Sequence, residues 1–194
     1  MEMCIGLDEV GRGCLAGDLV VCAYAFSPAL DMATRASARA LAMDSKKFSS
    51  RSRRAAAAAR LRDVGIFAFA RRSPAQIDAT DIRRATLGAF AEAATTVRER
   101  LGGPVRVIAD GRDIPEIGPP VEARVKGDAD IPEIGAASIL AKTLRDAEMD
   151  QLAQHWPGYG FETHAGYGTP AHRAAITRLG LSPVHRSWAR KFAS

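Results

Sequence analysis

Cysteine is scarce in this sequence of 194 residues: Cys4, Cys14 and Cys22 occur, an odd number with no CxxC pair. Neither a disulfide framework nor a zinc site is therefore supported, and we expect small, mostly buried thiols in a reducing cytoplasm. The apolar run at 19–26 is too short to span a bilayer, and the first residues carry no basic leader. We expect a cytoplasmic protein that does not enter a membrane.

What the sequence does contain is an ordinary globular composition, with 47% hydrophobic and 25% charged residues. Such a composition excludes a disordered, collagen-like or coiled-coil chain. The length suits one domain, which we place at residues 1–194, and it is sufficient to bury a core without disulfides.

The net charge of +5 is distributed unevenly along the chain. Residues 51–100 carry 11 basic and 5 acidic groups, whereas residues 101–150 carry 6 basic and 10 acidic groups. A basic protein of this size often binds nucleic acid, although a solvated arginine-rich helix surface gives the same count. Charge alone therefore leaves a nucleic-acid partner open.

Hydrophobic patterns and turn residues predict a mixed α/β sheet flanked by helices. We expect strands at 4–7, 19–26, 66–70, 105–109 and 121–125. The expected helices cover 31–43, a segment capped by Ser49 or Ser50 and ending near 62, a segment from Asp78 or Thr80 to about 101, 134–155 and 170–179.

Acidic residues follow three of the predicted strands. Asp8 and Glu9 come after the first strand, Asp110 after the fourth and Asp128 after the fifth. Ligands gather at the carboxyl ends of strands in α/β sheets, and converging carboxylates repel one another unless a cation separates them. Oxygen ligands favour Mg²⁺ or Mn²⁺, and a pair of such ions is the usual device for cutting a phosphodiester bond.

Each acid also has a simpler interpretation, because Asp110 precedes a glycine as in a turn and Asp128 could cap the following helix. The run Gly11–Ala16 fits the dinucleotide-binding pattern GxGxxA, but a strand rather than a helix is predicted after it. That second class of function remains a distant alternative.

Several ordered motifs resemble the ribonuclease HII family. They run from residue 6 to residue 186 and are specific in combination: GLDEVGRGCLAG at 6–17, DSKKFS at 44–49, ADG at 109–111, VKGD at 125–128, GAASILAK at 135–142, RD at 145–146, YGF at 159–161, HAGYGT at 164–169 and SPVHR at 182–186. The resemblance implies a ribonuclease H-like fold in which a helical C-terminal segment, about 150–194, lines the substrate groove.

The resemblance also implies an activity: metal-dependent hydrolysis of the RNA strand in RNA–DNA hybrids, and cleavage 5′ of ribonucleotides embedded in duplex DNA. The products would carry 3′-hydroxyl and 5′-phosphate ends. Two Mg²⁺ or Mn²⁺ ions are expected during catalysis, and the partners would be hybrid and ribonucleotide-containing duplexes. We expect a monomer with no obligate protein partner.

The same resemblance places functional residues. Its metal-binding carboxylates correspond to Asp8, Glu9, Asp110 and Asp128, and its substrate contacts to Gly11, Arg12, Gly13, Lys46, Lys47, Lys142 and Tyr167. We expect a helix salt bridge or a supporting role for Asp146, and structural or substrate-side roles for His164 and His185.

The chain departs from the family at Asp18, where proline is usual, and in a longer stretch at 27–43. It also ends soon after the SPVHR motif, so we expect no C-terminal partner-binding tail. Two alternatives stay open: another nuclease of the same superfold, and an RNA–DNA hybrid-binding protein without activity. The repeated string IPEIG at 114–118 and 131–135 has no functional explanation.

Overall fold

The computed structural model describes residues 3–43, 48, 50–118 and 120–193, and a mixed sheet forms its centre. Its strands are β1 (Met3–Val10), β2 (Leu19–Phe26), β3 (Gly65–Arg72), β4 (Val105–Asp110) and β5 (Val121–Arg124). The strand order is β3-β2-β1-β4-β5, with antiparallel pairs from β3 to β1 and parallel pairs from β1 to β5. The predicted mixed α/β sheet is confirmed.

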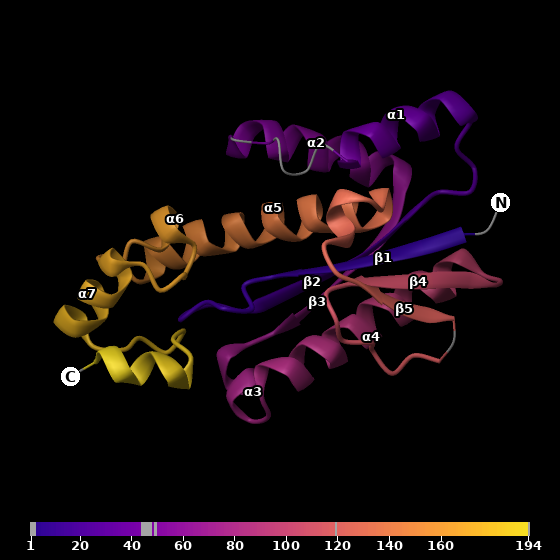
Figure 1. The fold of residues 1–194 in the computed structure, drawn as a ribbon. Helices are drawn as coiled ribbons and strands as arrows, with labels where there is room; N and C mark the ends of the chain where they lie inside the picture. Colours follow the sequence, from indigo (N-terminus) through magenta and orange to yellow (C-terminus); the bar gives the residue numbers. More distant parts are fainter. Residues whose placement is uncertain (1–2, 44–47, 49, 119, 194) are drawn as a thin grey trace.

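Helices cover both faces of this sheet (Figure 1). One face packs against α1 (Met32–Met43), α2 (Arg51–Val64) and α5 (Pro132–His155), and the other against α3 (Pro74–Asp78) and α4 (Ile82–Leu101). A short 3-10 helix, η2 (Gly127–Ala129), precedes α5. None of the described helices is both long and apolar enough to cross a membrane.

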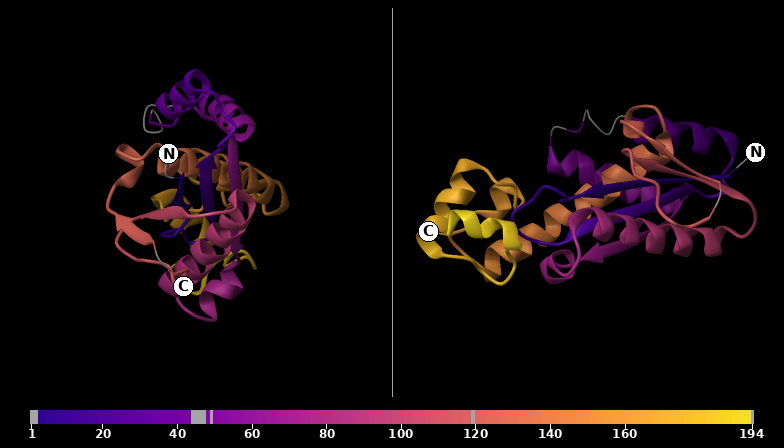
Figure 2. Two further views of the ribbon diagram at one scale, coloured as in Figure 1. Left: turned by 90° about the vertical axis from the view of Figure 1, so that its right-hand side faces the viewer. Right: turned by 60° about the horizontal axis from the view of Figure 1, so that its bottom comes forward.

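The C-terminal segment is helical, as expected, and lies beyond one end of the sheet (Figures 1 and 2). It comprises α6 (Phe161–His164), α7 (Pro170–Leu179) and the 3-10 helix η3 (Ser187–Phe192). Its own apolar cluster includes Phe161 and Ile176, and it reaches back to Leu15 and Ala16 in the loop between β1 and β2. This segment is therefore packed against the loop that joins the first two strands.

The core forms two layers because successive side chains of a strand point to opposite faces. In β2, which is buried along its whole length, Cys22 and Tyr24 pack under α1, α2 and α5. The intervening Val21 and Ala23 pack against α4 on the other face. A strand covered on both sides reads as a continuous apolar run, which explains why this strand is visible in the sequence.

Several boundaries differ from the predicted ones. The strand expected at 4–7 continues to Val10, because Asp8, Glu9 and Val10 still pair with β2. The helix expected from Asp78 or Thr80 begins slightly later, at Ile82, because Asp81 caps α4. A short helix before it, α3, was not predicted and is capped by Ser73 in a capping box. The helix expected at 134–155 begins at Pro132, a residue that suits the first helical position.

Helix α5 approaches β1 closely at Gly6. A Cβ atom added to Gly6 would collide with the backbone of Glu133 and Ile134 at the start of α5. Only glycine lets a helix backbone and a strand backbone approach so closely. This contact fixes α5 along β1, the strand that carries Asp8 and Glu9.

Replacing Gly6 with alanine should therefore separate α5 from β1 and lower the free energy of unfolding by about 3 kcal/mol or more. The matched control is Gly88→Ala within α4, where the nearest atom to an added Cβ is 3.6 Å away. That control should be neutral or stabilising by up to about 1 kcal/mol, because alanine favours helix over glycine. Urea unfolding measures the free energy of unfolding of both variants. Equal values for Gly6→Ala and Gly88→Ala would contradict the close contact between α5 and β1.

Candidate functional site

Three of the predicted acids meet at the ends of β1 and β4. The parallel pairing of these strands ends at Leu7 and Ala109, so Asp8 and Asp110 are the next residues on two neighbouring strands. Burial raises the pKa of Asp8 well above its usual value, and the charges of Glu9 and Asp110 raise it further. Burial likewise raises the pKa of Glu9, with Arg12 opposing and Asp110 adding to the shift.

Backbone and hydroxyl groups hold these acids in place. Asp8 is 8% exposed, and it accepts hydrogen bonds from the backbone N–H of Glu9 at 2.8 Å and from the side chain of Ser138 on α5. Asp110 accepts a hydrogen bond from the backbone N–H of Gly127 at 2.8 Å. Ser138 on α5 and Gly127 in the turn before α5 therefore hold the two carboxylates in place.

Asp128, the fourth predicted acid, lies half-buried in η2 and not directly at the end of β5. Its neighbour Gly127 is the residue that binds Asp110, so the chain carries Asp128 to the same end of β4. The structure thus brings Asp8, Glu9 and Asp110 together and places Asp128 directly after Gly127, the residue that donates to Asp110.

Among these acids, Glu9 has a positive partner, Arg12, at 3.6 Å. In the described part of the chain, no lysine or arginine forms an ion pair with Asp8 or Asp110. Within those same residues, no group of three or more acidic, histidine or cysteine side chains is closely enough arranged to hold a metal ion as it stands. The donor chemistry nevertheless fits a hard cation, because buried carboxylates that repel one another lose their penalty when one binds between them.

The loop from Gly11 to Asp18 begins beside the acids. Arg12 forms ion pairs with Glu9 at 3.6 Å and with Asp113 at 3.4 Å. Gly11 has a φ of +88° and packs directly on the side chain of Arg145. Gly13 is exposed, with open space where a Cβ atom would lie. Of the two glycines, Gly13 is the one that leaves room for a ligand.

Tyr167 and Lys142 line a cavity of about 350 Å³ between α2, α5 and α6. Tyr167 is 43% exposed, and Lys142 binds Asp146 at 2.6 Å. The helix salt bridge expected for Asp146 is therefore present, and Arg54 adds a second at 3.0 Å. Lys46 and Lys47 lie outside the described residues.

Sequence reasoning missed two basic residues at this cavity, Arg51 and Arg54 on α2. The available signal was the basic cluster that follows the helix cap, Ser50, which accepts a hydrogen bond from the N–H of Arg53. Arg51 pairs with Asp150 at 2.7 Å. The wall opposite Tyr167 is therefore basic, although its charges are partly neutralised.

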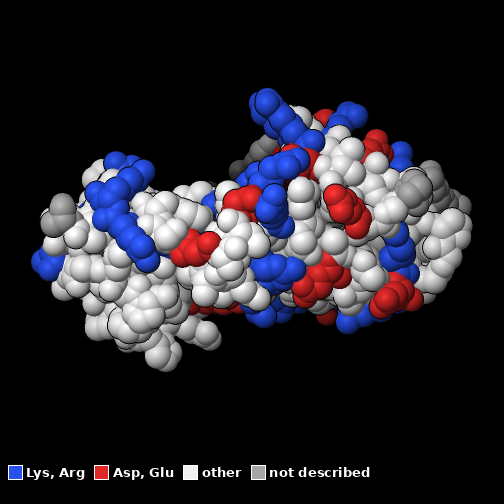
Figure 3. Space-filling view, turned by 90° about the horizontal axis from the view of Figure 1, so that it is seen from below, with Lys and Arg blue, Asp and Glu red and all other residues white. Residues whose placement is uncertain are grey.

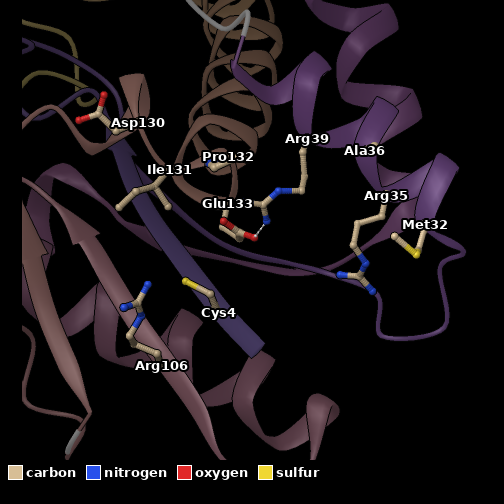
Figure 4. Close-up of a pocket in the computed structure, with 10 residues that line it drawn as sticks. All are labelled: Cys4, Met32, Arg35, Ala36, Arg39, Arg106, Asp130, Ile131, Pro132 and Glu133. Atoms are coloured by element: carbon tan, nitrogen blue, oxygen red, sulfur yellow. Dashed lines mark hydrogen bonds and ion pairs between the residues drawn. The ribbon is translucent and has the colours of Figure 1, made fainter. Parts of the chain in front are cut away.

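A larger cavity of about 480 Å³ lies elsewhere, beside Cys4 and Arg106 near the amino-terminal ends of β1 and β4 (Figure 4). Figure 4 shows Arg39 reaching from α1 to Glu133, with which it forms an ion pair at 2.6 Å. None of the predicted site residues lines this cavity. The acids and the cavity beside Tyr167 are therefore the candidate site.

Three buried histidines lie together in the C-terminal segment: His172 is hydrogen-bonded to His185, and His164 stacks on His172. His172 Nδ1 lies 2.9 Å from the carbonyl of Tyr167, so that nitrogen must donate, and its Nε2 then accepts from His185 Nε2 at 3.1 Å. His185 Nδ1 accepts from the N–H and hydroxyl of Ser182. His164 donates from Nε2 to the carbonyl of Tyr159. Through His172, the cluster holds the backbone carbonyl of Tyr167.

Many of the arginines in residues 51–100 form ion pairs with acidic side chains. Arg71 binds Glu148, Arg72 binds Glu92 and Arg83 binds Asp113, each within 3.0 Å. On the face seen in Figure 3, positive and negative side chains are accordingly interspersed. Net charge in a sequence segment is thus a weak guide to a nucleic-acid surface.

A mixed sheet in the order β3-β2-β1-β4-β5, with carboxylates at the ends of β1 and β4, defines the class of ribonuclease H-like nucleases. The model of the family "Ribonuclease HII" matches residues 5–192. The chain belongs to the ribonuclease HII family and is therefore a hydrolase acting on RNA in RNA–DNA hybrids. The dinucleotide-binding alternative is wrong, because the glycine-containing loop leads into β2 and not into a helix.

Known proteins resemble the chain over nearly its whole length. A ribonuclease HII of Halorhodospira halophila is 45% identical over 191 residues, which are 97% of this chain and 91% of the relative. The ribonuclease HII of Archaeoglobus fulgidus, solved in complex with PCNA, has a TM-score of 0.80 at 27% identity and 97% and 94% coverage of the two chains. Bst-RNase HIII, solved with Mn²⁺, shares the fold with a TM-score of 0.74 at 18% identity, with 99% and 64% coverage.

Because Asp8 is buried among like charges, Asp8→Asn should stabilise the metal-free protein by about 1–2 kcal/mol. The exposed Glu99→Gln on α4 should change the stability by less than about 0.5 kcal/mol. Urea unfolding in EDTA measures both variants. A loss of stability in Asp8→Asn would show that the carboxylate is not under electrostatic stress.

Acid should destabilise the histidine cluster. Burial, reinforced by His164 and His185, lowers the pKa of His172 from about 6.5 to about 4. The unfolded chain therefore binds a proton that the folded chain does not between these values, and stability falls as the pH drops through this window, by at most about 3 kcal/mol. In His172→Gln, the free energy of unfolding should fall less steeply from pH 6.5 to pH 4; an unchanged slope would contradict this account.

Proposed function

We propose that this ribonuclease HII family member cuts the RNA strand of RNA–DNA hybrids and cleaves 5′ of ribonucleotides embedded in duplex DNA. The products would carry 3′-hydroxyl and 5′-phosphate ends, and Mg²⁺ or Mn²⁺ would be required. The observation that carries the proposal is the buried Asp8, which lies beside Glu9 and Asp110 with no positive side chain paired to it in the described structure. A carboxylate in that position is stable at neutral pH when it binds a cation.

The acids would share two ions. Asp8, Asp110 and Asp128 would hold one, and Asp8 and Glu9 would hold the other. Ions held there would supply an activated water and would stabilise the leaving 3′-oxygen. Ser138 and the N–H of Gly127 would orient Asp8 and Asp110 from α5 and the turn before it when the carboxylates bind.

Recognition of the ribonucleotide would fall to the loop and to Tyr167. Gly13 has open space at its Cα, which would allow backbone groups to approach the 2′-hydroxyl, the group that distinguishes RNA from DNA. The exposed face of Tyr167 would pack on the neighbouring sugar. Arg12 would exchange its contacts with Glu9 and Asp113 for the nucleic acid.

The cavity beside Tyr167 would take a phosphate of the bound strand. Lys142 lines it together with Arg51 and Arg54, and all three donate to acidic side chains that a phosphate would partly replace. Lys46 and Lys47 stay predicted phosphate contacts. Affinity for nucleic acid should therefore decrease as the salt concentration rises.

Residues 1–194 would work as one unit and as a monomer, with the helical segment at 150–194 lining the groove. Support for a single unit comes from hydrogen bonds between that segment and the loop after β1: Leu15 donates to Gly166 at 2.8 Å and Gly17 donates to Val184 at 2.9 Å. No obligate protein partner is needed for a site made of these residues.

Cleavage mapping on a DNA duplex with one embedded ribonucleotide tests the proposal. The wild-type protein should cut at the 5′ side of that ribonucleotide in Mg²⁺ or Mn²⁺. Asp110→Asn should lower kcat/KM by more than about 100-fold, because loss of a supporting group alone costs 10- to 100-fold in other metal sites. Glu99→Gln, a carboxylate-to-amide change on exposed α4, should cut at the wild-type rate.

Two outcomes would overturn the assignment. Wild-type cleavage by folded Asp110→Asn would remove this residue from the site. Retention of hybrid without cleavage in Mn²⁺ by the wild-type protein would favour a hybrid-binding protein instead.

A further inference from the structure

Two buried arginines hold the loop between β1 and β2 from beneath. Arg186, in the C-terminal segment, donates from Nη1 to the carbonyl of Arg12 at 3.0 Å. It also donates from Nε and Nη2 to the carbonyl of Gly17, at 3.0 and 2.8 Å. One guanidinium therefore ties the start of the loop to its end.

Arg145, on α5, binds the same loop from the other side. Its guanidinium donates to the carbonyls of Ala16, at 2.9 Å, and Asp18. A Cβ atom on Gly11 would lie 2.6 Å from Arg145 Nε, and that nitrogen is buried with no hydrogen-bond partner. Glycine at position 11 is therefore needed to admit the arginine, whereas Gly13 packs on nothing.

Neither arginine is neutralised. Arg186 is 0% exposed and Arg145 is 1% exposed, and in the described residues neither forms an ion pair with a carboxylate. Burial lowers the pKa of Arg186 to about 10, and the charge of Arg145 adds to the shift. Burying two adjacent cations without anions costs free energy of folding. The hydrogen bonds that these guanidinium groups make to the loop all go to backbone carbonyls.

The two arginines also join the loop to the segment that carries Tyr167. Arg145 Nη2 donates to the carbonyl of Ala165 at 3.3 Å, and the N–H of Leu15 donates to the carbonyl of Gly166. A Cβ atom on Gly166 would lie 2.5 Å from the carbonyl oxygen of Ala16. Gly13 and Tyr167, which would contact the same ribonucleotide, are thus built on one rigid support.

We propose that Arg145 and Arg186 are positioning residues that set the discrimination between a ribonucleotide and a deoxyribonucleotide. They would do so by fixing the loop backbone from Gly11 to Gly13 relative to Tyr167, without contacting substrate. The inference rests on the proposed function, in which this loop reads the 2′-hydroxyl.

The test measures binding in the Asp110→Asn background, which the proposed function makes inactive, with Mg²⁺ present. Fluorescence anisotropy would compare a DNA duplex with one ribonucleotide against the all-DNA duplex. Arg186→Lys keeps the charge but loses the planar fork that spans two carbonyls. Its preference for the ribonucleotide duplex should fall about 10- to 100-fold, as expected for a site displaced by roughly 1 Å, while its affinity for the all-DNA duplex stays unchanged.

The matched control is Arg178→Lys on α7, since Arg178 also donates to a backbone carbonyl, that of Gly158 at 3.0 Å, which is not part of the loop. The control should keep the full preference. Equal loss of affinity for both duplexes in Arg186→Lys would indicate general damage and overturn the inference, as would an unchanged preference. If the wild-type loop itself shows no preference in this background, the proposed function fails and the inference fails with it.

Trp188 reports the loop shape independently of nucleic acid. Its indole N–H donates to the carbonyl of Cys14 at 3.1 Å, and the guanidinium of Arg186 lies 5.3 Å from its ring centre. In a Trp156→Phe background, Arg186→Lys should shift the tryptophan emission while the far-ultraviolet circular dichroism stays unchanged. Arg145→Lys gives the same binding test if Arg186→Lys fails to fold, and unchanged emission and preference in Arg145→Lys would overturn the inference.

Discussion

The contact between Gly6 and the start of α5 governs the geometry of the rest of the site. Once α5 is fixed along β1, its residues reach successive parts of the site at helical spacing: Ser138 touches Asp8, Lys142 lines the cavity beside Tyr167, and Arg145 holds the loop. The interval from Ser138 to Arg145 is about 10 Å of helix. One glycine therefore sets the position of acids, cavity and loop relative to one another.

The sequence predicted the fold class and the convergence of three acids because those features depend on local patterns. Continuous apolar strands and acids at their ends are readable without knowledge of tertiary contacts. The boundaries were harder: β1 continues past Asp8 because of its pairing with β2, a partner that no local pattern identifies. Arg51 and Arg54 were missed for the same reason, since only the packing of α2 on α5 brings them to the cavity beside Tyr167.

The repeated pentapeptide shows how far tertiary context overrides local sequence. The copy at 114–118 lies in the connection between β4 and β5, whereas the copy at 131–135 leads into α5. In the second copy Glu133 is buried and paired with Arg39, and Gly135 packs against the carbonyl of Ala42. The first copy forms no helix, although Ile117 packs in the apolar layer with α4 and its carbonyl accepts a hydrogen bond from Arg98 at 2.7 Å.

Opposite charges are buried unpaired on the two sides of one loop, and Arg12 joins them. Its guanidinium reaches Glu9 beside the acids, while its carbonyl is held by Arg186 beneath the loop. Asp18, where the family usually has proline, accepts a hydrogen bond from Arg145 through its backbone carbonyl, and a proline would offer the same carbonyl. The loop thus depends on backbone shape at Asp18, but Gly11 and Gly17 are required as glycines because Arg145 and Met149 leave no room for a Cβ atom there. Under the proposed function, Asp8 and Asp110, which form no ion pair with a described lysine or arginine, would bind cations, and the loop held by the two buried arginines would meet a polyanion. The separation of charge that costs stability would then suit the site to its substrate.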